Sequence, residues 1–400
     1  MQEISGGIGN VPGFKSAGIS CGIKKNGKKD LALIYSEKPA AAAGIFTTSR
    51  VKAAPVLYCQ GILPSKQIHV VLINSGNANA CTGKQGMDNI LYLTEVLAGH
   101  LKVSDKTVLM CSTGVIGAPL PVDKIETAIP ALLQNLKSGD NPAPAEAIIT
   151  TDLTIKQAAV RLNIQGREIT IGGMAKGSGM ICPNMATMLA FVATDAQIKT
   201  GVMQDALQAA ADKSFNRITV DGDMSTNDTL LLLANGASQV TLSPADPDWP
   251  LFCAGLDLVC ERLAQLIIRD GEGATKVIEI RVEQAASREG ALRIAYQIAN
   301  SNLVKTALFA ADANWGRIMG AAGAANVDFD QHKVDLWIGE ILLVENGVGR
   351  GKEVENQVHE ILKKADVLIR VVLHQGDKQA TVWGNDLSYD YVRINVDYRS

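Results

Sequence analysis

Two stretches in the first half of the chain share one pattern, in which an apolar run leads directly into a loop of small and polar residues. They are HVVLINSGNANACTG (His69–Gly83) and TVLMCSTGVIG (Thr107–Gly117). A short, continuous apolar run bounded by turn residues is typical of a buried strand. Loops that follow such strands are positioned by a rigid scaffold and commonly carry functional groups. The pattern therefore predicts buried strands whose chemistry lies in the loops at their ends.

Helical and strand patterns follow in the second half of the chain. Apolar spacing of three and four predicts helices over Gly201–Ser214 and Pro250–Arg269, and strict alternation predicts a strand over Lys276–Val282. From about Val334 onward, apolar runs predict strands around one helix at Lys352–Lys364. These segments predict a smaller α/β unit at the C-terminal end.

The length of the chain also bears on its organisation. At 400 residues the chain is too long for one small core, and about two or three domains are expected. We expect an α/β fold with a larger N-terminal unit, about residues 1–280, in which mixed sheets are sandwiched between helices. A smaller C-terminal α/β unit, about residues 281–400, completes it.

The composition excludes several classes of partner. The chain has 38 basic and 41 acidic residues, a net charge of -3, and no basic block that would bind nucleic acid or an anionic membrane. Its seven cysteines include no C-x-x-C pair, which favours a reducing cytosol over a disulfide framework or a zinc site. No secretory signal is visible, and apolar runs such as Leu230–Ala234 are far too short to span a membrane. We expect a cytoplasmic protein that binds a small molecule.

Several familiar motifs fail on inspection. NGVGRGKE (Asn346–Glu353) lacks the first glycine and the final Ser or Thr of a phosphate-binding P-loop. DGDMSTND (Asp221–Asp228) begins like a calcium loop, but Thr226 occupies the position of the turn glycine, so a loop with capped carboxylates is expected. The five histidines share no short spacing, and Cys182 is expected to be a small buried thiol. We expect no metal site.

Thr187 stands out within GSGMICPNMATMLAF (Gly177–Phe191), because it places a hydroxyl in an apolar stretch. A threonine can act as a nucleophile without histidine if cleavage makes it the first residue of a chain, since its own α-amine then serves as the base. That amine has a pKa near 7.7–8.0, well below the value of about 10.4 for lysine. From the residues alone, an ordinary polar position in an apolar strand or helix remains the favoured interpretation.

A set of motifs favours the nucleophile instead. These motifs resemble those of the arginine-biosynthetic glutamate N-acetyltransferase / ornithine acetyltransferase family along almost the whole chain. The closest motif is KGSGM followed by PNMATML, which is similar to the self-cleavage site of that family. The other motifs are NSGNANACTG (Asn74–Gly83), STGVIG (Ser112–Gly117), ITVDGD with STNDT (Ile218–Thr229), DGEGATK (Asp270–Lys276), ANWGRIMGA (Ala313–Ala321) and YVRINVDYRS (Tyr391–Ser400).

The resemblance implies a self-cleaving acyltransferase with the fold expected above. The cut would fall between Ala186 and Thr187, giving an α chain of residues 1–186 and a β chain of residues 187–400 that stay together, in an α2β2 assembly. Thr187 would take the acetyl group of N2-acetylornithine as an ester and pass it to glutamate in a ping-pong reaction. No cofactor is required, because the amide of one substrate becomes the amide of the other.

The resemblance also assigns site residues. Thr113 and Gly114 would form the oxyanion hole. Substrate contacts would come from Thr150, Lys176, Thr187, Glu272, Asn395 and Ser400. Two departures weaken this transfer: the chain has Leu153 after TTD, and it ends in Ser400, where the family commonly has threonine at both positions.

Three alternatives remain open. The enzyme could be bifunctional and also make N-acetylglutamate from acetyl-CoA, which would then be a second substrate. A related self-cleaving aminopeptidase or amidase would use the same nucleophile with water as acceptor. An uncleaved metabolite-binding protein would run as one full-length polypeptide on a denaturing gel.

Overall fold

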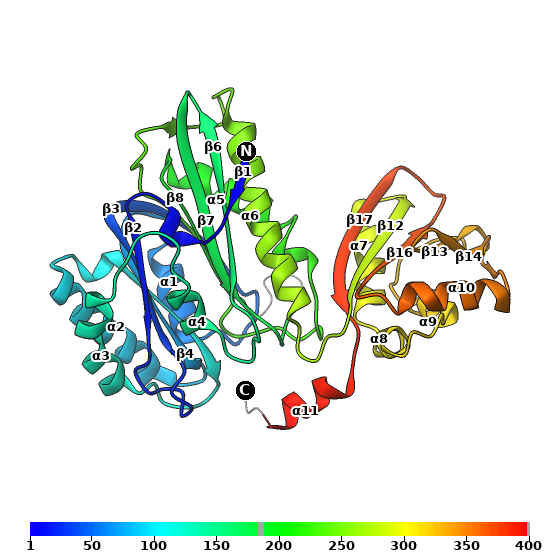
Figure 1. Cartoon of the computed structure of the whole chain (residues 1–400), viewed down its shortest axis with the longest axis horizontal. Coiled ribbons are helices and arrows are strands. Elements are labelled where there is room, and N and C mark those ends of the chain that lie inside the picture. Colours follow the sequence, from blue (N-terminus) through cyan, green and yellow to red (C-terminus); the bar gives the residue numbers. More distant parts are fainter. Residues whose placement is uncertain (183–187, 398–400) are drawn as a thin grey trace.

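The computed structural model of the chain describes residues 1–182 and 188–397. Figure 1 shows a large N-terminal unit and a smaller C-terminal unit side by side, with the last helix returning from the small unit toward the large one. That helix is α11 (Tyr389–Asp397). The predicted site residues Ala186, Thr187 and Ser400 lie outside the described residues.

The large unit is built on one mixed sheet. Its strands are β1 (Gln2–Ile4), β2 (Phe14–Ile19), β3 (Leu31–Phe46), β4 (Ser65–Asn77), β5 (Val108–Val115), β6 (Lys156–Ile164), β7 (Arg167–Lys176), β8 (Leu189–Thr194) and β10 (Thr229–Ala234). Their order is β1-β6-β7-β8-β10-β3-β4-β5, and β2 pairs with β3. The pairs β4–β5 and β8–β10 are parallel, whereas the other neighbours are antiparallel. The strands β4 and β5 confirm the prediction made from the apolar runs.

Helices cover both faces of this sheet, as expected. They are α1 (Ala54–Ile62), α2 (Gly83–Leu101), α3 (Val122–Gln134), α4 (Ala143–Ile148), α5 (Thr200–Ala211) and α6 (Trp249–Arg269). In β10, Leu230 and Leu232 pack in the core shared with α5 and α6, whereas Leu231 and Leu233 pack in the core shared with α4. A strand buried on both faces is apolar at successive positions. This explains the run TLLLLA, whose side chains are all buried.

Short elements complete the large unit. The strands β9 (Gln197–Ile198) and β11 (Thr241–Leu242) pair in parallel outside the main sheet. One-turn 3-10 helices lie at Ile8–Asn10, Asp105–Thr107 and Phe215–Arg217, and another lies in the small unit at Gln331–Lys333.

The small unit is a second mixed sheet packed against helices. Its strands are β12 (Val277–Ala285), β13 (Asp335–Ile338), β14 (Ile341–Glu345), β15 (Val348–Gly349), β16 (Asp366–Val372) and β17 (Lys378–Asn385), in the order β15-β14-β13-β16-β12-β17. Its helices are α7 (Arg288–Ala299), α8 (Asn302–Phe309), α9 (Trp315–Gly323) and α10 (Lys352–Leu362). Alternation in β12 follows the expected pattern, because Ile280 is buried in the core while Glu279 and Arg281 form an ion pair on the other face. The boundary expected near residue 280 falls inside β12.

The two units are joined by backbone contacts as well as by the chain itself. The N–H of Thr219 donates to the carbonyl of Trp383 in β17 at 3.0 Å. Lys305 of α8 extends its ammonium to the carbonyl of Val220 at 2.7 Å. The loop that carries Thr219 and Val220 therefore links the small unit to the large one.

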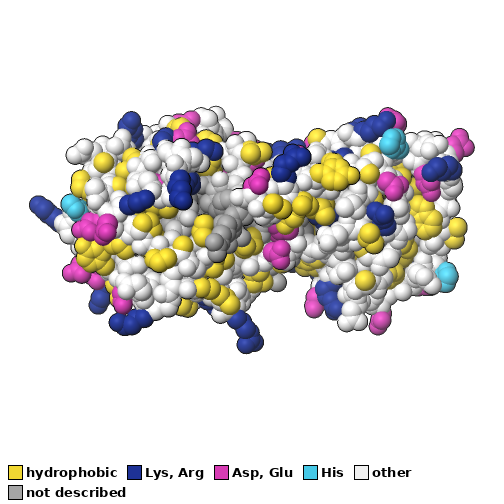
Figure 2. Space-filling view, turned by 90° about the horizontal axis from the view of Figure 1, so that it is seen from below, with side chains coloured by type: hydrophobic (Ala, Val, Ile, Leu, Met, Phe, Trp, Pro, Cys, Tyr) yellow, Lys and Arg dark blue, Asp and Glu magenta, His cyan; other side chains and the backbone are white. Residues whose placement is uncertain are grey.

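The surface carries charges of both signs. Figure 2 shows basic and acidic side chains interspersed over one face, with hydrophobic side chains between them. Within residues 1–182 and 188–397, no helix is long and apolar enough to cross a membrane.

Candidate active site

One pocket collects the described residues that the motifs assign to the site. It is lined by Thr113, Gly114, Ile116, Thr150, Thr151, Lys176, Gly179, Met180, Ser225, Thr226, Asn227, Glu272 and Asn395. These residues come from the ends of β5 and β7, the turns after α4 and α6, the loop before β10, and α11. Thr113, Gly114, Thr150, Lys176, Glu272 and Asn395 thus meet in one place although they are far apart in the sequence.

Thr113 and Gly114 lie at the end of β5, where β5 runs against β4. Gly114 has φ +132, and a Cβ atom at this position would lie 2.4 Å from the carbonyl carbon of Gly76. A side chain is therefore excluded at residue 114 by backbone geometry and by close approach of β4. Thr113 is buried, and its Oγ1 lies 3.5 Å from Nζ of Lys176. The junction places Thr113 and Gly114 next to each other in the lining of the pocket.

Lys176 is the ammonium group of the pocket and ends strand β7. Its side chain is almost completely buried, and this burial lowers the pKa of Lys176. The carboxylates of Asp152, Asp228 and Glu272 raise it again, while the neighbouring charge of Lys156 lowers it further. The carboxylates favour the charged form of Lys176, and a charged ammonium in the pocket lining can bind an anionic group of a ligand that enters the pocket.

Glu272 supplies a carboxylate from the turn after α6. Its Oε2 accepts a hydrogen bond of 2.8 Å from Nδ2 of Asn395 in α11. Gly179 lies directly against it, because a Cβ atom at residue 179 would come within 2.4 Å of the Glu272 carboxyl carbon. Glycine at this position therefore leaves room for the carboxylate, and α11 orients it.

Thr150 lies after α4, at the start of a tight turn. Its N–H donates to Oδ2 of Asp152 at 3.0 Å, and the N–H of Leu153 donates to Oδ2 of Asp270 at 3.0 Å. The side chain of Leu153 is 83% exposed. Replacement of the usual threonine by leucine therefore places an apolar group in solvent, while backbone hydrogen bonds hold the turn that carries Thr150.

Two aspartates hold the chain on either side of residues 183–187. Oδ2 and Oδ1 of Asp221 accept hydrogen bonds from the N–H groups of Met180 and Ile181, at 2.7 and 2.9 Å. Oδ1 of Asp228 accepts one from Met188 at 2.9 Å. The loop DGDMSTND is thus a loop with capped carboxylates, as the sequence predicted. Its position beside the residues that flank the segment 183–187 could not be predicted, because the two segments are about 40 residues apart.

The chemistry at Asp228 differs from that of an exposed carboxylate. Its side chain is fully buried, and burial raises its pKa well above the usual value. The N–H of Met188 and the charge of Lys176 act in the opposite direction. Asp228 therefore lies next to Met188 as a carboxyl group that retains a proton more readily than usual.

Other candidate groups do not enter the pocket. The histidines are absent from its described lining, and in the described chain no three His, Cys, Asp or Glu residues cluster as metal ligands. Burial, together with the charges of Asp221 and other aspartates, raises the pKa of Cys182 to about 11. A thiol with this pKa is protonated at neutral pH and is a poor nucleophile.

A larger cavity of about 590 Å³ lies elsewhere, between α6, β6 and the small unit. Its charged side chains form ion pairs, for example Arg262 with Glu3 and Arg269 with Asp366. The residues assigned to the site by the motifs do not line it. The larger cavity is therefore not the one that brings together the residues assigned by the motifs.

Comparisons with known proteins agree with the motifs. A model of the ArgJ family matches residues 15–400. A relative from Symbiobacterium thermophilum, named arginine biosynthesis bifunctional protein ArgJ, is 46% identical over 403 residues, and the match covers 100% of both chains. A relative of the same name from Geobacter sulfurreducens is 47% identical over 392 residues, covering 98% of this chain and 100% of the relative.

A solved structure of the same kind adds agreement in three dimensions. The arginine biosynthesis bifunctional protein argJ from Bacillus halodurans is 48% identical with a TM-score of 0.50. The match covers 52% of this chain and 98% of the solved chain. The resemblance inferred from KGSGM and PNMATML is thus confirmed over the length of the sequence, and the chain belongs to the ArgJ family.

Proposed function

We propose that this chain is an acyltransferase of arginine biosynthesis that moves the acetyl group of N2-acetylornithine to glutamate. The observation that carries the proposal is the convergence of Thr113–Gly114, Lys176 and Glu272 in one pocket of an ArgJ-family chain. Relatives that match the full length are named for arginine biosynthesis. The pocket supplies an oxyanion site, a cation and a carboxylate, which suit acetylated amino acids.

The two substrates share the groups that this pocket can bind. Both carry an α-carboxylate, which the buried ammonium of Lys176 would neutralise. Ornithine also carries a side-chain ammonium, for which Glu272 is the matching charge. Because N2-acetylornithine and glutamate share the α-carboxylate, one site can bind them in turn through Lys176.

The nucleophile would be made by self-cleavage at the motif threonine. The hydroxyl of Thr187 attacks the carbonyl of Ala186, the peptide nitrogen leaves, and an ester replaces the amide. The α-amine of Thr187 is free once the nitrogen has left, and water then hydrolyses the ester, which releases the carboxyl end of residue 186 and restores the hydroxyl of Thr187. The hydrogen bonds of Asp221 and Asp228 to the flanking residues support this step, because they fix the chain on both sides of the bond.

Acetyl transfer would then proceed in two halves. The α-amine of Thr187 removes the hydroxyl proton, and Oγ1 attacks the acetyl carbonyl of N2-acetylornithine. Thr113 and Gly114 stabilise the tetrahedral oxyanion. The leaving amine takes up the proton, ornithine departs, and an acetyl ester remains on Thr187. Glutamate attacks this ester through its α-amine, which restores the free hydroxyl and yields N-acetylglutamate.

The sheet explains why the two fragments would stay together. Strand β8 follows the proposed cut, yet it lies between β7, which precedes the cut, and β10, which follows it. Strand β10 in turn pairs with β3. The solved relative chain, about half as long as this one, is consistent with a two-chain enzyme. We further propose an α2β2 assembly in the cytoplasm that needs no cofactor.

The proposal is tested by an exchange assay with N2-acetylornithine and isotopically labelled glutamate. We expect labelled N-acetylglutamate to form with parallel lines in double-reciprocal plots, because ornithine leaves before glutamate reacts. The Thr187→Ser variant retains a hydroxyl and should keep part of the rate, whereas Thr187→Ala should lose the exchange. Release of acetate without transfer to glutamate would instead identify an amidase and contradict the proposal.

A second activity is favoured by the names of the relatives, which call them bifunctional. We propose that acetyl-CoA can also acetylate Thr187, as a weaker donor than N2-acetylornithine. The described pocket holds one lysine, Lys176, and has no P-loop that would bind the phosphates of CoA. Comparing N-acetylglutamate formation from the two donors at equal concentration tests this order. Faster transfer from acetyl-CoA would contradict it.

A further inference from the structure

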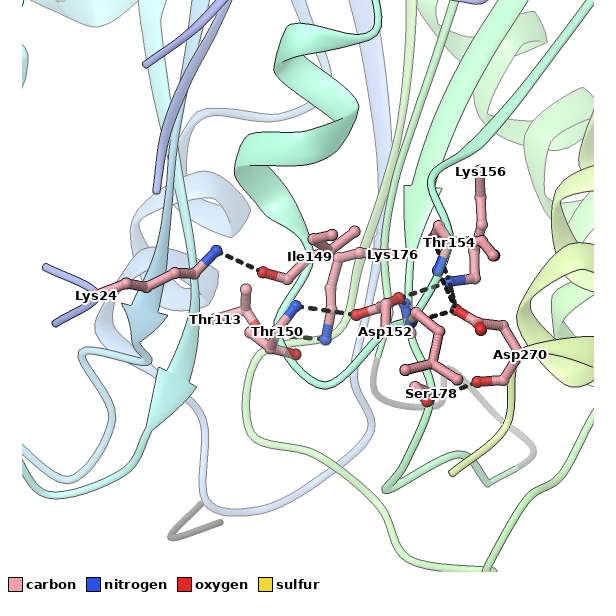
Figure 3. A network of polar contacts seen from close by, with 12 residues as sticks. Lys24, Thr113, Ile149, Thr150, Asp152, Thr154, Lys156, Lys176, Ser178 and Asp270 are labelled. Carbon is pink, nitrogen blue, oxygen red and sulfur yellow. Dashed lines mark hydrogen bonds and ion pairs between the residues drawn. The ribbon is translucent and has the colours of Figure 1, made fainter. Parts of the chain in front are cut away.

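A buried group of charges lies behind the pocket and does not belong to the assigned site. It consists of Lys156, Asp152 and Asp270, called here the Lys156 cluster. The ammonium of Lys156, at the start of β6, donates to Oδ1 of Asp152 at 2.7 Å and to Oδ2 of Asp270 at 2.6 Å. A third hydrogen bond of 3.2 Å goes to the carbonyl of Thr154. Figure 3 shows Asp152 between Thr150 and the ammonium of Lys156, with Asp270 on the far side of Asp152.

Each carboxylate of the cluster holds a different piece of backbone. Asp152 accepts hydrogen bonds from the N–H groups of Thr150 at 3.0 Å and of Gly177 at 2.7 Å. Thr150 is itself a proposed substrate contact, and Gly177 directly follows Lys176. The carboxylate therefore joins two walls of the pocket.

Asp270 reaches a third wall. Its Oδ2 accepts from the N–H of Leu153, and its carbonyl accepts from the hydroxyl of Ser178 at 2.6 Å. The carbonyl of Ser178 then accepts from the N–H of Glu272 at 2.9 Å. The position of Glu272 is thus connected through Ser178 to the same cluster.

A gain in folding stability does not by itself explain why such a cluster is present. Removing charges from water has a desolvation cost that their mutual attraction often fails to exceed, so apolar residues could fill such a site equally well. This cost applies here, because the side chains of Lys156 and Asp152 are fully buried and that of Asp270 is nearly so. Their shared feature is contact with the backbone of the pocket. We propose that the Lys156 cluster aligns the substrate contacts and that Asp152 keeps the ammonium of Lys176 charged.

The electrostatics support this division of roles. Burial raises the pKa of Asp152, but the charges of Lys176 and Lys156 and its hydrogen bonds lower it to about 2, so Asp152 is ionised at neutral pH. Asp152 is also the leading influence that counteracts burial at Lys176. The charges that act most strongly on Lys176 are those of Asp152, Lys156, Asp228 and Glu272, and the charge of Lys24 acts on it as well. The charge of Asp270 is not among the strongest.

Because Asp152 influences Lys176 more strongly than Asp270 does, the two aspartates offer a matched pair of variants. The test rests on the proposed acetyl transfer. Asp152→Asn and Asp270→Asn each remove one charge without changing side-chain size. We expect both to lower kcat/KM, because both loosen the backbone of the pocket. In Asp152→Asn the high-pH limb of the kcat/KM profile should also move down by about one pH unit, because Lys176 then loses its proton at lower pH. In Asp270→Asn the high-pH limb of the kcat/KM profile should stay within about 0.3 pH unit of the wild type. Loss of an adjacent charge would instead move it by about one pH unit.

Several controls separate positioning from general damage to the fold. Asp195→Asn changes another buried aspartate that caps a backbone N–H, that of Thr170 at 2.8 Å, at the opposite end of β7 and β8. It should leave the profile and kcat/KM unchanged. Mass spectrometry of each variant shows whether cleavage has occurred, and thermal unfolding compares their stability. Lys156→Arg, which keeps the charge, should retain more activity than Lys156→Met.

The outcomes distinguish this inference from the proposed function. If wild-type protein makes no N-acetylglutamate, the proposed function fails and the inference fails with it. If the wild type is active but the high-pH limb of Asp152→Asn coincides with that of Asp270→Asn, the cluster has no specific effect on Lys176 and the inference alone is overturned.

Discussion

Gly114 shows how a single residue fixes the geometry of the pocket. With φ +132 and β4 backbone atoms 2.4 to 2.5 Å from the position of a Cβ, residue 114 has no room for a side chain. The preceding Thr113 is thereby held with its hydroxyl at the pocket wall. Residues at the ends of strands are positioned more rigidly than residues in long loops.

Thr113→Ala tests the oxyanion role directly. Because the hydroxyl would stabilise the transition state more than the bound substrate, we expect kcat to fall by about 10²–10³, with little change in KM. Thr113→Ser retains the hydroxyl and should stay within about one order of magnitude of the wild type. Steady-state kinetics with N2-acetylornithine measure both. A raised KM at constant kcat would show that Thr113 binds the ground state instead.

Gly179→Ala tests the close contact with Glu272. A Cβ atom there would lie 2.4 Å from the carboxylate, so Glu272 must move and its hydrogen bond with Asn395 must weaken. We expect kcat/KM to fall by about 10-fold or more, from loss of a hydrogen bond to a charged group. Gly201→Ala is the matched control, because a Cβ at Gly201 meets open space. Equal kinetics for the two variants would contradict the arrangement of the pocket.

At the scale of elements, α11 connects the C-terminal end of the chain to the site. It has no buried residue among those described. Its contacts include the hydrogen bonds of Asn395 to Glu272 and of the Tyr391 hydroxyl to Asp221 at 3.2 Å, and an edge-to-face contact of Tyr389 with Phe309. A helix held in this way depends on a few specific hydrogen bonds. We expect this helix to orient groups at the pocket.

Asn395→Ala should therefore weaken substrate use without unfolding the protein. We expect kcat/KM to fall by about 10-fold, because a hydrogen bond to a charged group contributes about 1.5–3 kcal/mol. Arg393→Ala, on the same helix, removes an exposed ion pair with Asp390 and should change the rate little. The ratio of the two kcat/KM values is the measurement. An equal loss in both variants would indicate that the helix as a whole, and not Asn395, is responsible.

Elements with strong periodicity could be predicted from the sequence, whereas contacts between distant segments could not. The expected helix at Pro250–Arg269 is α6 (Trp249–Arg269), and the expected strand at Lys276–Val282 is β12 (Val277–Ala285). Both elements have one apolar face, so their periodic apolar spacing can be recognised in the local sequence. Asp270 lies 114 residues from Lys156, and neither spacing nor motif relates them. The motifs located the pocket residues, but only folding placed the Lys156 cluster behind them.

At the scale of the whole molecule, Lys305 links the two units. Its ammonium donates to the carbonyls of Val220 and Asn385 at 2.7 and 2.6 Å and to Oδ1 of Asn385 at 2.8 Å. Burial lowers the pKa of Lys305 to about 8, although Asp221 and Asp386 oppose this. In the unfolded chain a lysine has a pKa near 10.4.

This shift predicts a pH dependence of stability. Between pH 8 and about 10.4 the unfolded chain binds more protons at Lys305 than the folded protein, so this group makes the free energy of unfolding rise with pH. Below pH 8 the full cost of keeping the buried ammonium charged is present. Denaturant unfolding of wild type and Lys305→Met across this range measures the effect. The difference between them should increase with pH in favour of the wild type, and a constant difference would contradict the burial effect.

The most direct test of the central claim is to trap the acetylated enzyme. Wild-type protein is mixed with N2-acetylornithine in the absence of glutamate, quenched in acid within milliseconds, and analysed by intact and peptide mass spectrometry. We predict two fragments that meet between Ala186 and Thr187, with one acetyl group on Thr187 that disappears when glutamate is added before the quench. An acetyl group on another residue, or an uncleaved chain that still transfers acetyl to glutamate, would contradict the account.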